Sequence, residues 1–416
     1  MRIKHINLAV TINPNDSELA CQGSIQMSNP EEKPFIHLNK LLELEELYLK
    51  EKNSRIDLAF SPSEIDPEFF IKASKKWSIE LPANYQEKEE LELFFKYRGK
   101  IQRDEPYKTN YLTSEAIELA IYVAWYPIVE LDDNPTFQVK LKRIDNWLWT
   151  MNAPRKSESE NTIVWERKDP ATDLTLLGRP KTTAITKEMS AIFWGDKSFL
   201  ENFSSLEQDI LGFKQKLEDW LGKPKNDAFQ IAISSRESGG TYVRQGLIST
   251  QGNLPEEYFT TKKKRFLLGW MHEIAHLWFA ASEKSTYHNW LDEAIADYSA
   301  LLLSELFYGK KFFEEILEKH RKMIEKEKDL PAIKEITRSH EKSYIVFYKW
   351  GSLILHEIRR KIGLDLFLEV LRDFADKSKK QTVVNTDDFI ESLNRLTSDD
   401  WSGFINKHLS IKPKVQ

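Results

Sequence analysis

The segment that decides the fold of this 416-residue chain is Gly269–Ser282, which reads GWMHEIAHLWFAAS. It is apolar throughout except for three strongly polar side chains, His272, Glu273 and His276. Burying two imidazoles and a carboxylate without compensation costs several kcal/mol of folding free energy. These three groups are therefore expected to share a partner that offsets the cost of burying them.

The spacing H-E-x-x-H supplies such a partner if the segment is a helix. His272 and His276 are four residues apart, so they lie one turn apart on one face and can bind a single ion, with Glu273 beside it. Two neutral imidazoles suit zinc and leave a coordination position for water. The alternative is a pair of hydrogen-bonded core histidines. Because a metal offsets the burial cost and ordinary packing does not, the sequence predicts one Zn²⁺ per chain, although ligand type biases the choice of metal without fixing it.

A third ligand is expected from the next helical segment, Asn289–Tyr298, which reads NWLDEAIADY. Glu293 and Asp297 share one face of this helix, and Glu293 would face the first helix if the two pack antiparallel. We therefore predict Glu293 as the third ligand and Asp297 as the acceptor of the free N–H of a zinc-bound imidazole. The alternative is a solvated acidic face, which we prefer for Asp292 alone.

The first half of the chain has the alternating pattern of β-strands. The candidate strands are INLAVTI, WSIELP, LELFFKY, IELAIYVAWYP, TFQVKLK and NTIVWERK. A helix over 200–221 follows, and then AFQIAIS and TYVRQGLIST are expected to be two strands, with Gly239–Gly240 as the turn between them. After Thr261 the pattern is helical. We predict an α+β protein with an N-terminal antiparallel β sandwich or saddle-like domain (1–195) and a mostly helical domain with a small sheet (196–416).

HEIAH followed by WLDEAIADY resembles the gluzincin metallopeptidases, and specifically the aminopeptidase N family, whose pattern is H-E-x-x-H, a spacer and W-L-N-E-G-x-A. The resemblance implies that 196–416 is a thermolysin-like catalytic domain. The run EAIAD is similar to the thermolysin version, in which the acidic residue four after the ligand supports a histidine. Sixteen residues separate His276 from Glu293, against eighteen in the family, which implies a shorter loop between the two helices.

Two further segments extend the resemblance from about Tyr97 to the final helix, although only the zinc motif is highly specific by itself. YIVFYKWGSLILHEI is similar to the family's Y-E-K-G helix, whose tyrosine stabilises the oxyanion, and this implies that role for Tyr348. Tyr344 is the alternative, and an aromatic core face is another. WYPIVELDDNPTFQV resembles the family's FPCFDEPAFKA segment in the N-terminal domain.

The family's G-A-M-E-N strand carries a glutamate that binds the substrate's α-amine, and here the resemblance fails. The equivalent stretch is GGTYVRQGLI, which puts Gly240 at the first glycine, Val243 at the glutamate and Arg244 beside it. A valine cannot bind an ammonium group, and an arginine repels one unless its side chain points outward. Glu237 could replace the glutamate only if its loop folds back. The strand is still expected to pair with a substrate backbone.

Many relatives continue with a large helical domain over the active site, and this chain is expected to lack it. An open cleft without the amine anchor favours zinc-dependent hydrolysis of peptides or oligopeptides by a metal-activated water, with Glu273 as general base, and not by a strict aminopeptidase. The alternatives are a conventional aminopeptidase with a different amine anchor, an enzyme that hydrolyses another bond such as an epoxide, and a catalytically silent binding scaffold.

The composition is that of an ordinary globular protein and does not favour a nucleic-acid-binding or membrane protein. The net charge of −5 is mild, so we predict peptide substrates as partners and no nucleic acid or membrane partner. Cys21 is the single cysteine, which is compatible with a reducing compartment. The N-terminus lacks the pattern of a signal peptide, and a cytoplasmic location is expected. The sequence does not determine the oligomeric state.

Overall fold

The computed structural model describes residues 1–28, 33–51, 54–63, 71–86, 88–103, 108–182, 184–188, 192–196, 203, 206–225, 230–234, 236, 240–381 and 383–414. The chain folds into two compact units. The first unit comprises Met1–Leu200 and Phe229–Asn253, and the second comprises Glu201–Ala228 and Leu254–Gln416. The boundary at 195/196 separates predicted functional domains and stays a prediction.

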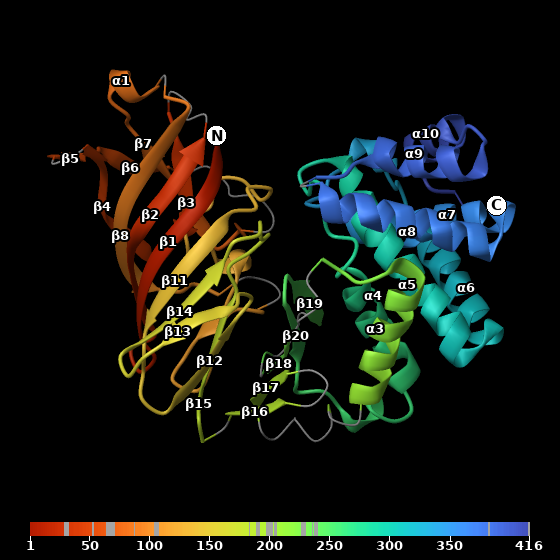
Figure 1. Cartoon of the computed structure of the whole chain (residues 1–416), viewed down its shortest axis with the longest axis horizontal. Helices are drawn as coiled ribbons and strands as arrows, with labels where there is room; N and C mark the ends of the chain where they lie inside the picture. The colour runs from red at the N-terminus through yellow and green to blue at the C-terminus, as the bar shows by residue number, and fades with distance from the viewer. Residues whose placement is uncertain are drawn as a thin grey trace. The chain divides into compact units, whose positions relative to one another are not determined.

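The first unit is built around an eight-stranded sheet of order β13-β14-β11-β1-β2-β8-β4-β5 (Figure 1). Its strands are β1 (Arg2–Asn13), β2 (Glu18–Ser28), β4 (Leu42–Glu51), β5 (Ser54–Asp57), β8 (Glu90–Lys100), β11 (Thr136–Lys142), β13 (Arg155–Glu158) and β14 (Thr162–Arg167). The pairing is antiparallel except between β1 and β11, which run parallel. Phe137, Val139 and Leu141 of β11 are fully buried, as their alternation with polar residues predicts.

Three smaller sheets complete the first unit. One has the order β12-β15-β10-β9, another β3-β7-β6, and the third β16-β17-β18-β20-β19. Their strands are β3 (Phe35–Asn39), β6 (Phe60–Ser63), β7 (Ser74–Ile79), β9 (Tyr111–Leu112), β10 (Ile117–Leu119), β12 (Trp147–Met151), β15 (Leu176–Pro180), β16 (Ala184–Glu188), β17 (Ile192–Asp196), β18 (Gln230–Ser234), β19 (Thr241–Arg244) and β20 (Leu247–Gln251). Two short helical turns, α1 (Ala83–Gln86) and η2 (Ile121–Val123), lie between strands.

The prediction of one strand over TYVRQGLIST is wrong, because this segment is the β19–β20 hairpin. Gly246 has φ of +82°, a left-handed conformation that glycine adopts without strain, and the chain reverses there. β18 then pairs in parallel with β20 and leaves β19 at the sheet edge. Of the predicted Gly239–Gly240 turn, Gly239 lies outside the described residues. The predicted strand IELAIYVAWYP is also too long, since β10 ends at Leu119 and the 3₁₀ turn η2 follows.

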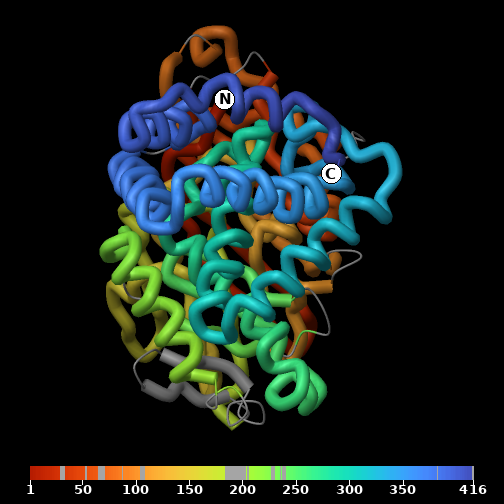
Figure 2. Tube along the Cα trace, turned by 90° about the vertical axis from the view of Figure 1, so that its right-hand side faces the viewer, coloured from red at the N-terminus to blue at the C-terminus, as the bar shows by residue number. Residues whose placement is uncertain are grey.

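The second unit is helical, and Figure 2 traces its helices. Its elements are α3 (Glu207–Leu221), η3 (Glu256–Tyr258), α4 (Lys263–Ala275), η4 (Tyr287–Asn289), α5 (Trp290–Tyr308), α6 (Lys310–Lys326), η5 (Ile333–Glu335), η6 (Tyr344–Trp350), α7 (Gly351–Ile362), α8 (Leu364–Lys380), α9 (Thr386–Thr397) and α10 (Ser402–Ser410). α5 is the central helix, buried from Trp290 to Ser304 and packed against α4, α6, α7 and η6. Among the described residues, no helix combines the length and apolarity needed to cross a membrane.

A glycine allows α7 to approach α5 closely at the level of the candidate site. A Cβ atom added to Gly351 would lie 2.6 Å from the Cβ of Ala294, which follows Glu293 in the chain. Real Cβ atoms do not approach so closely, so the two helices would have to move apart. Gly351 and Ala294 therefore set the distance between α5 and the helix that follows η6.

The contact at Gly351 leads to a testable stability difference between two glycines. Gly351→Ala should lower the free energy of unfolding by about 1–3 kcal/mol, because it overpacks a buried helix contact. Gly403→Ala in α10 meets no atom within 4 Å and should raise stability by about 0.4–1 kcal/mol. Urea titration of both variants measures the difference. Equal stability of the two variants would contradict the close-packing role of Gly351.

Candidate metal centre

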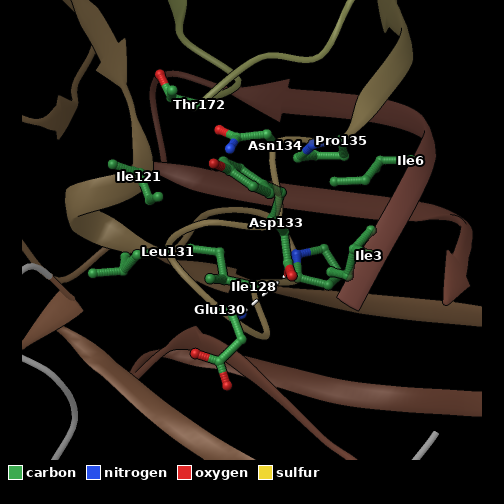
Figure 3. A pocket seen from close by; sticks show the side chains of 12 residues that line it. Ile3, Ile6, Ile121, Ile128, Glu130, Leu131, Asp133, Asn134, Pro135 and Thr172 are labelled. Atoms are coloured by element: carbon green, nitrogen blue, oxygen red, sulfur yellow. Dashed lines mark hydrogen bonds between the residues drawn. The ribbon is translucent and has the colours of Figure 1, made fainter. Parts of the chain in front are cut away.

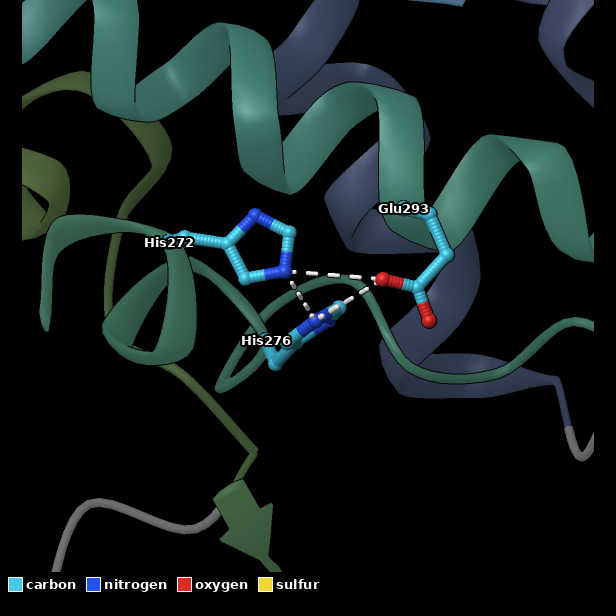
Figure 4. Close-up of side chains that lie close together, drawn as sticks. All are labelled: His272, His276 and Glu293. Atoms are coloured by element: carbon cyan, nitrogen blue, oxygen red, sulfur yellow. Dashed lines mark hydrogen bonds and ion pairs between the residues drawn. The ribbon is translucent and has the colours of Figure 1, made fainter. Parts of the chain in front are cut away.

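His272 and His276 lie together at the end of α4. His272 is in the last turn of the helix, and His276 follows it with φ −64° and ψ −9°, which keeps it on the same face. Their Nε2 atoms are 3.1 Å apart. From α5, the Oε2 atom of Glu293 lies 3.5 Å from Nε2 of His272 and 3.6 Å from Nε2 of His276. The three residues thus direct one atom each toward a common point (Figure 4).

The loop between α4 and α5 is held by Asp292, which the sequence interpretation assigned to a solvated acidic face. That assignment is wrong, because Asp292 is only 4% exposed. Its carboxylate accepts hydrogen bonds from the backbone N–H of Ser282 (3.2 Å) and from Nδ2 of Asn289 (3.2 Å). Burial raises the pKa of Asp292 to about 6, although the hydrogen bond from Ser282 acts to lower it. Asp292 therefore fixes the loop that leads into α5 and so the position of Glu293.

The charges around Glu293 fit a cation. Burial alone would raise the pKa of Glu293, but Arg338 and the two histidines hold it well below its usual value. Its Oε2 atom is buried and accepts no hydrogen bond from the described residues. Burial lowers the pKa of His276, but the nearby Glu293 carboxylate outweighs burial and raises this pKa to about 9. A position that favours positive charge, with two imidazole nitrogens and one carboxylate oxygen around it, matches the ligand set of a catalytic zinc ion.

The other nitrogen of each imidazole faces an oxygen, within hydrogen-bond distance for His276 and further away for His272. Nδ1 of His276 lies 2.8 Å from the carbonyl oxygen of Phe279, so Nδ1 is the donor and Nε2 is free to bind a metal. Nδ1 of His272 faces Oδ1 of Asp297 at 3.9 Å. Asp297 thus lies near the ring nitrogen of His272 that does not face Glu293, and its support of a zinc-bound histidine stays a prediction.

Asp297 has further partners that sequence reasoning missed. Nζ of Lys349 donates to its Oδ1 (2.8 Å), and Oγ of Ser352 donates to its Oδ2 (2.8 Å). Nδ1 of His320, from α6, lies 3.6 Å from Oδ2. Burial would raise the pKa of Asp297, but Lys349, His320 and His272 together lower it. The aspartate is therefore ionised and its charge is balanced inside the unit.

Arg338 is a further residue of the site that no sequence pattern predicts. Its Nη2 atom lies 3.3 Å from Oε1 of Glu293, and its guanidinium carbon lies 4.8 Å from the ring centre of Tyr348. It belongs to the segment between η5 and η6, which carries no motif. Arg338, Lys349 and His320 come from three separate elements, and no local spacing relates them to the H-E-x-x-H motif.

The structure brings Tyr348, and not Tyr344, against the metal ligands. The ring of Tyr348 stacks on His272 with 5.2 Å between centres and 12° between planes, whereas Tyr344 is 50% exposed. Both tyrosines belong to η6, a π-helical turn of a kind that is frequent at functional sites. Burial raises the pKa of Tyr348 well above its usual value; Arg338 opposes this, while Glu293 and Glu273 add to it. The hydroxyl is therefore protonated and can donate a hydrogen bond.

The three predicted substrate-binding residues all lie in the first unit. Gly240 precedes β19, and Val243 and Arg244 belong to that edge strand. Arg244 does not point into solvent, since its side chain is 12% exposed and its Nε donates to Oδ2 of Asp173 at 2.7 Å. Its guanidinium also lies over the ring of Tyr242. Glu237, the alternative amine anchor, lies outside the described residues.

A pocket of the first unit has fewer side chains that could act in catalysis or bind a metal than the histidine cluster has (Figure 3). Most of its lining is aliphatic, and it contains the partly buried carboxyl group of Asp133, whose pKa desolvation raises to about 7. The residues that line it are Ile3, Ile6, Ile121, Tyr126, Pro127, Ile128, Glu130, Leu131, Asp133, Asn134, Pro135 and Thr172. This lining contains no imidazole, so His272, His276 and Glu293 remain the candidate reaction centre.

The fold and the histidine–glutamate cluster together define a metallopeptidase of the H-E-x-x-H type. Residues 247–408, which span most of the helical unit, match the model of the peptidase family M1 domain. This part of the chain is therefore a peptidase family M1 domain, with His272, His276 and Glu293 as its H-E-x-x-H-type metal site. Among curated proteins, none matches the sequence.

Solved M1 structures share the fold over the whole chain. One is a glutamate-to-alanine mutant of an M1 zinc metallopeptidase from Deinococcus radiodurans, bound to a Tyr-Ser-Ala substrate, with a TM-score of 0.74 and 15% identity over 100% of this chain and 95% of that one. Native yeast LTA4 hydrolase gives a TM-score of 0.75 and 14% identity, over 100% of this chain and 68% of that one. The arrangement of a β-sheet domain followed by a helical catalytic domain is thus confirmed.

Proposed function

We propose that this M1 peptidase cleaves peptides or oligopeptides with one zinc ion held by His272, His276 and Glu293. The observation that carries the proposal is the convergence of their three ligand atoms within 4.8 Å of one another, around a buried carboxylate oxygen that accepts no hydrogen bond from the described residues. When bound there, zinc lowers the pKa of a coordinated water and polarises the scissile carbonyl.

The residues around the ligands divide the remaining chemistry. Glu273 follows His272 on α4 and accepts the proton of the attacking water, which it then passes to the leaving amine. The Tyr348 hydroxyl donates a hydrogen bond to the developing oxyanion. Asp297 orients His272 from behind. Two contacts of His272 support the roles of Asp297 and Tyr348: Asp297 lies near Nδ1 of the ring, and Tyr348 stacks on the ring face.

The role of Glu273 can be separated from metal binding. Glu273→Gln keeps the size of the side chain but cannot accept a proton, so kcat should fall by about 10²–10⁴-fold. Zinc content, measured by elemental analysis, should remain that of the wild-type protein because Glu273 is not a ligand. Substantial residual turnover by a zinc-loaded Glu273→Gln variant would refute the assignment of the general base.

The two tyrosines of η6 provide a matched pair for the oxyanion donor. Tyr348→Phe removes the hydroxyl next to His272 and should lower kcat by about 10²–10³-fold, the usual effect of losing one such donor. Tyr344→Phe removes an exposed hydroxyl and should leave kcat close to wild type. Steady-state kinetics on a chromogenic peptide distinguishes them. The reverse order of effects would transfer the role to Tyr344.

Weak dependence on a free substrate N-terminus is part of the proposal. The edge strand β19 offers backbone groups from Gly240 to Arg244 for pairing with a peptide, but Val243 has no charge with which to bind an ammonium. The charge of Arg244 is already paired with Asp173. The Deinococcus radiodurans relative, whose structure holds Tyr-Ser-Ala, supports a short peptide as substrate. The alternatives remain a conventional aminopeptidase with another amine anchor and a catalytically silent scaffold.

A matched pair of peptides tests this specificity. The zinc-loaded protein is incubated with one peptide that has a free N-terminus and with the same peptide acetylated, and products are identified by mass spectrometry. We expect internal cleavage of both, at rates within about tenfold of each other, because the proposal includes no side chain that binds the free amine and acetylation therefore removes less than about 1.4 kcal/mol of binding. Stepwise removal of single residues from the free peptide alone would identify an aminopeptidase. Cleavage of neither peptide, with zinc bound, would favour the silent scaffold.

A further inference from the structure

Asp297 connects two parts of the candidate site that are far apart in the chain. One of its oxygens, Oδ1, faces Nδ1 of His272 at 3.9 Å and accepts a hydrogen bond from Nζ of Lys349 at 2.8 Å. The other, Oδ2, accepts a hydrogen bond from Oγ of Ser352 at 2.8 Å. Asp297 is 9% exposed, Lys349 is 7% exposed and Ser352 is fully buried. These contacts are therefore shielded from water.

Lys349 and Ser352 both follow Tyr348 within one helical turn. Lys349 is the next residue after Tyr348, and Ser352 follows Tyr348 by four residues, one helical turn later. The π-helical turn η6 ends at Trp350, and α7 begins at Gly351. Asp297 thus binds the last part of η6 and the first turn of α7 at the same time. A turn held at two such points cannot rotate freely about its own axis.

We propose that Lys349 and Ser352 are positioning residues that, by their shared contact with Asp297, fix the Tyr348 hydroxyl relative to the metal ligands. The inference rests on the proposed function, since it takes Tyr348 as the oxyanion donor. The parallel stacking of Tyr348 on His272 is the geometry that this clamp maintains. Asp297 then positions both rings of that stack. It acts on the His272 ring directly and on the Tyr348 ring through Lys349 and Ser352.

The ionic contact is strong enough to hold this geometry. A hydrogen bond to a charged group inside a protein is about twice as strong as a neutral one, and Asp297 accepts two of them from one helical segment. Because an oxyanion donor acts only at close hydrogen-bond distance, a small rotation of η6 moves the hydroxyl out of range. The clamp should therefore influence kcat more than KM.

Ser352→Ala is the primary test, because it removes one contact of Asp297 and leaves the buried Lys349–Asp297 ion pair intact. We expect kcat to fall about tenfold with KM changed less than twofold, in line with a displaced transition-state donor. Ser304→Ala is the matched control. Ser304 is also buried on a helix, but it donates to the carbonyl of Leu301, and its variant should keep the wild-type kcat.

Combining Ser352→Ala with Tyr348→Phe shows whether the serine acts through the tyrosine. If it does, Ser352→Ala should change kcat less than twofold in the Tyr348→Phe background, against about tenfold in the wild type, since the donor it positions is already lost. The zinc affinity of Ser352→Ala, measured by competition with a chelator, should stay within about twofold of wild type. Lys349→Arg, which retains the charge, should keep more activity than Lys349→Met.

The outcomes separate the clamp from the function on which it rests. Independent, multiplicative losses in the double variant, or a lower zinc affinity of Ser352→Ala, would overturn the clamp and assign Ser352 to the support of His272. A wild-type kcat for Ser352→Ala would overturn it as well. A wild-type kcat for Tyr348→Phe would instead overturn the oxyanion role of Tyr348, and the clamp with it.

Discussion

The burial of two carboxylates one turn apart on α5 is the constraint on which the helical unit depends. Glu293 and Asp297 are both almost inaccessible to water, and an uncompensated charge in such a place costs several kcal/mol. Each is balanced by a cation from further along the chain, Glu293 by Arg338 and Asp297 by Lys349. These two pairings tie the segment from η5 to α7 against the central helix and bring Tyr348 to the histidines.

The two carboxylates are nevertheless satisfied to different degrees, and this difference separates their functions. Both oxygens of Asp297 accept a hydrogen bond from η6 or α7, so it anchors that segment to α5. Glu293 directs one oxygen to Arg338 and leaves Oε2 toward the imidazoles without a hydrogen bond from the described residues. This oxygen is therefore available as a metal ligand. Two acidic residues at equivalent positions of successive turns thus acquire distinct roles from their neighbours.

The sequence was informative where the relevant residues are close in the chain, and less so elsewhere. Helical spacing places His272 with His276 and Glu293 with Asp297. The alternating pattern predicts four strands of the large sheet, β1, β8, β11 and β14, but not the other four, β2, β4, β5 and β13. Arg338, Lys349 and His320 reach the site through tertiary packing, for which no local pattern exists. The β19–β20 hairpin was missed because its residues alternate as one strand would, and only the conformation of Gly246 interrupts them. Asp292 was misjudged because a buried loop contact and a solvated helix face have the same local sequence.

The short spacer between the two ligand segments shows how packing compensates for a departure from the family pattern. Sixteen residues join His276 to Glu293, so the chain has less freedom to bring Glu293 to the histidines. The carboxylate of Asp292 ties the middle of this loop to its C-terminal end by accepting from Ser282 N–H and Asn289 Nδ2. Asn289 also donates to the hydroxyl of Ser282. Because these bonds order the second half of the loop, less chain remains to be ordered between His276 and Glu293.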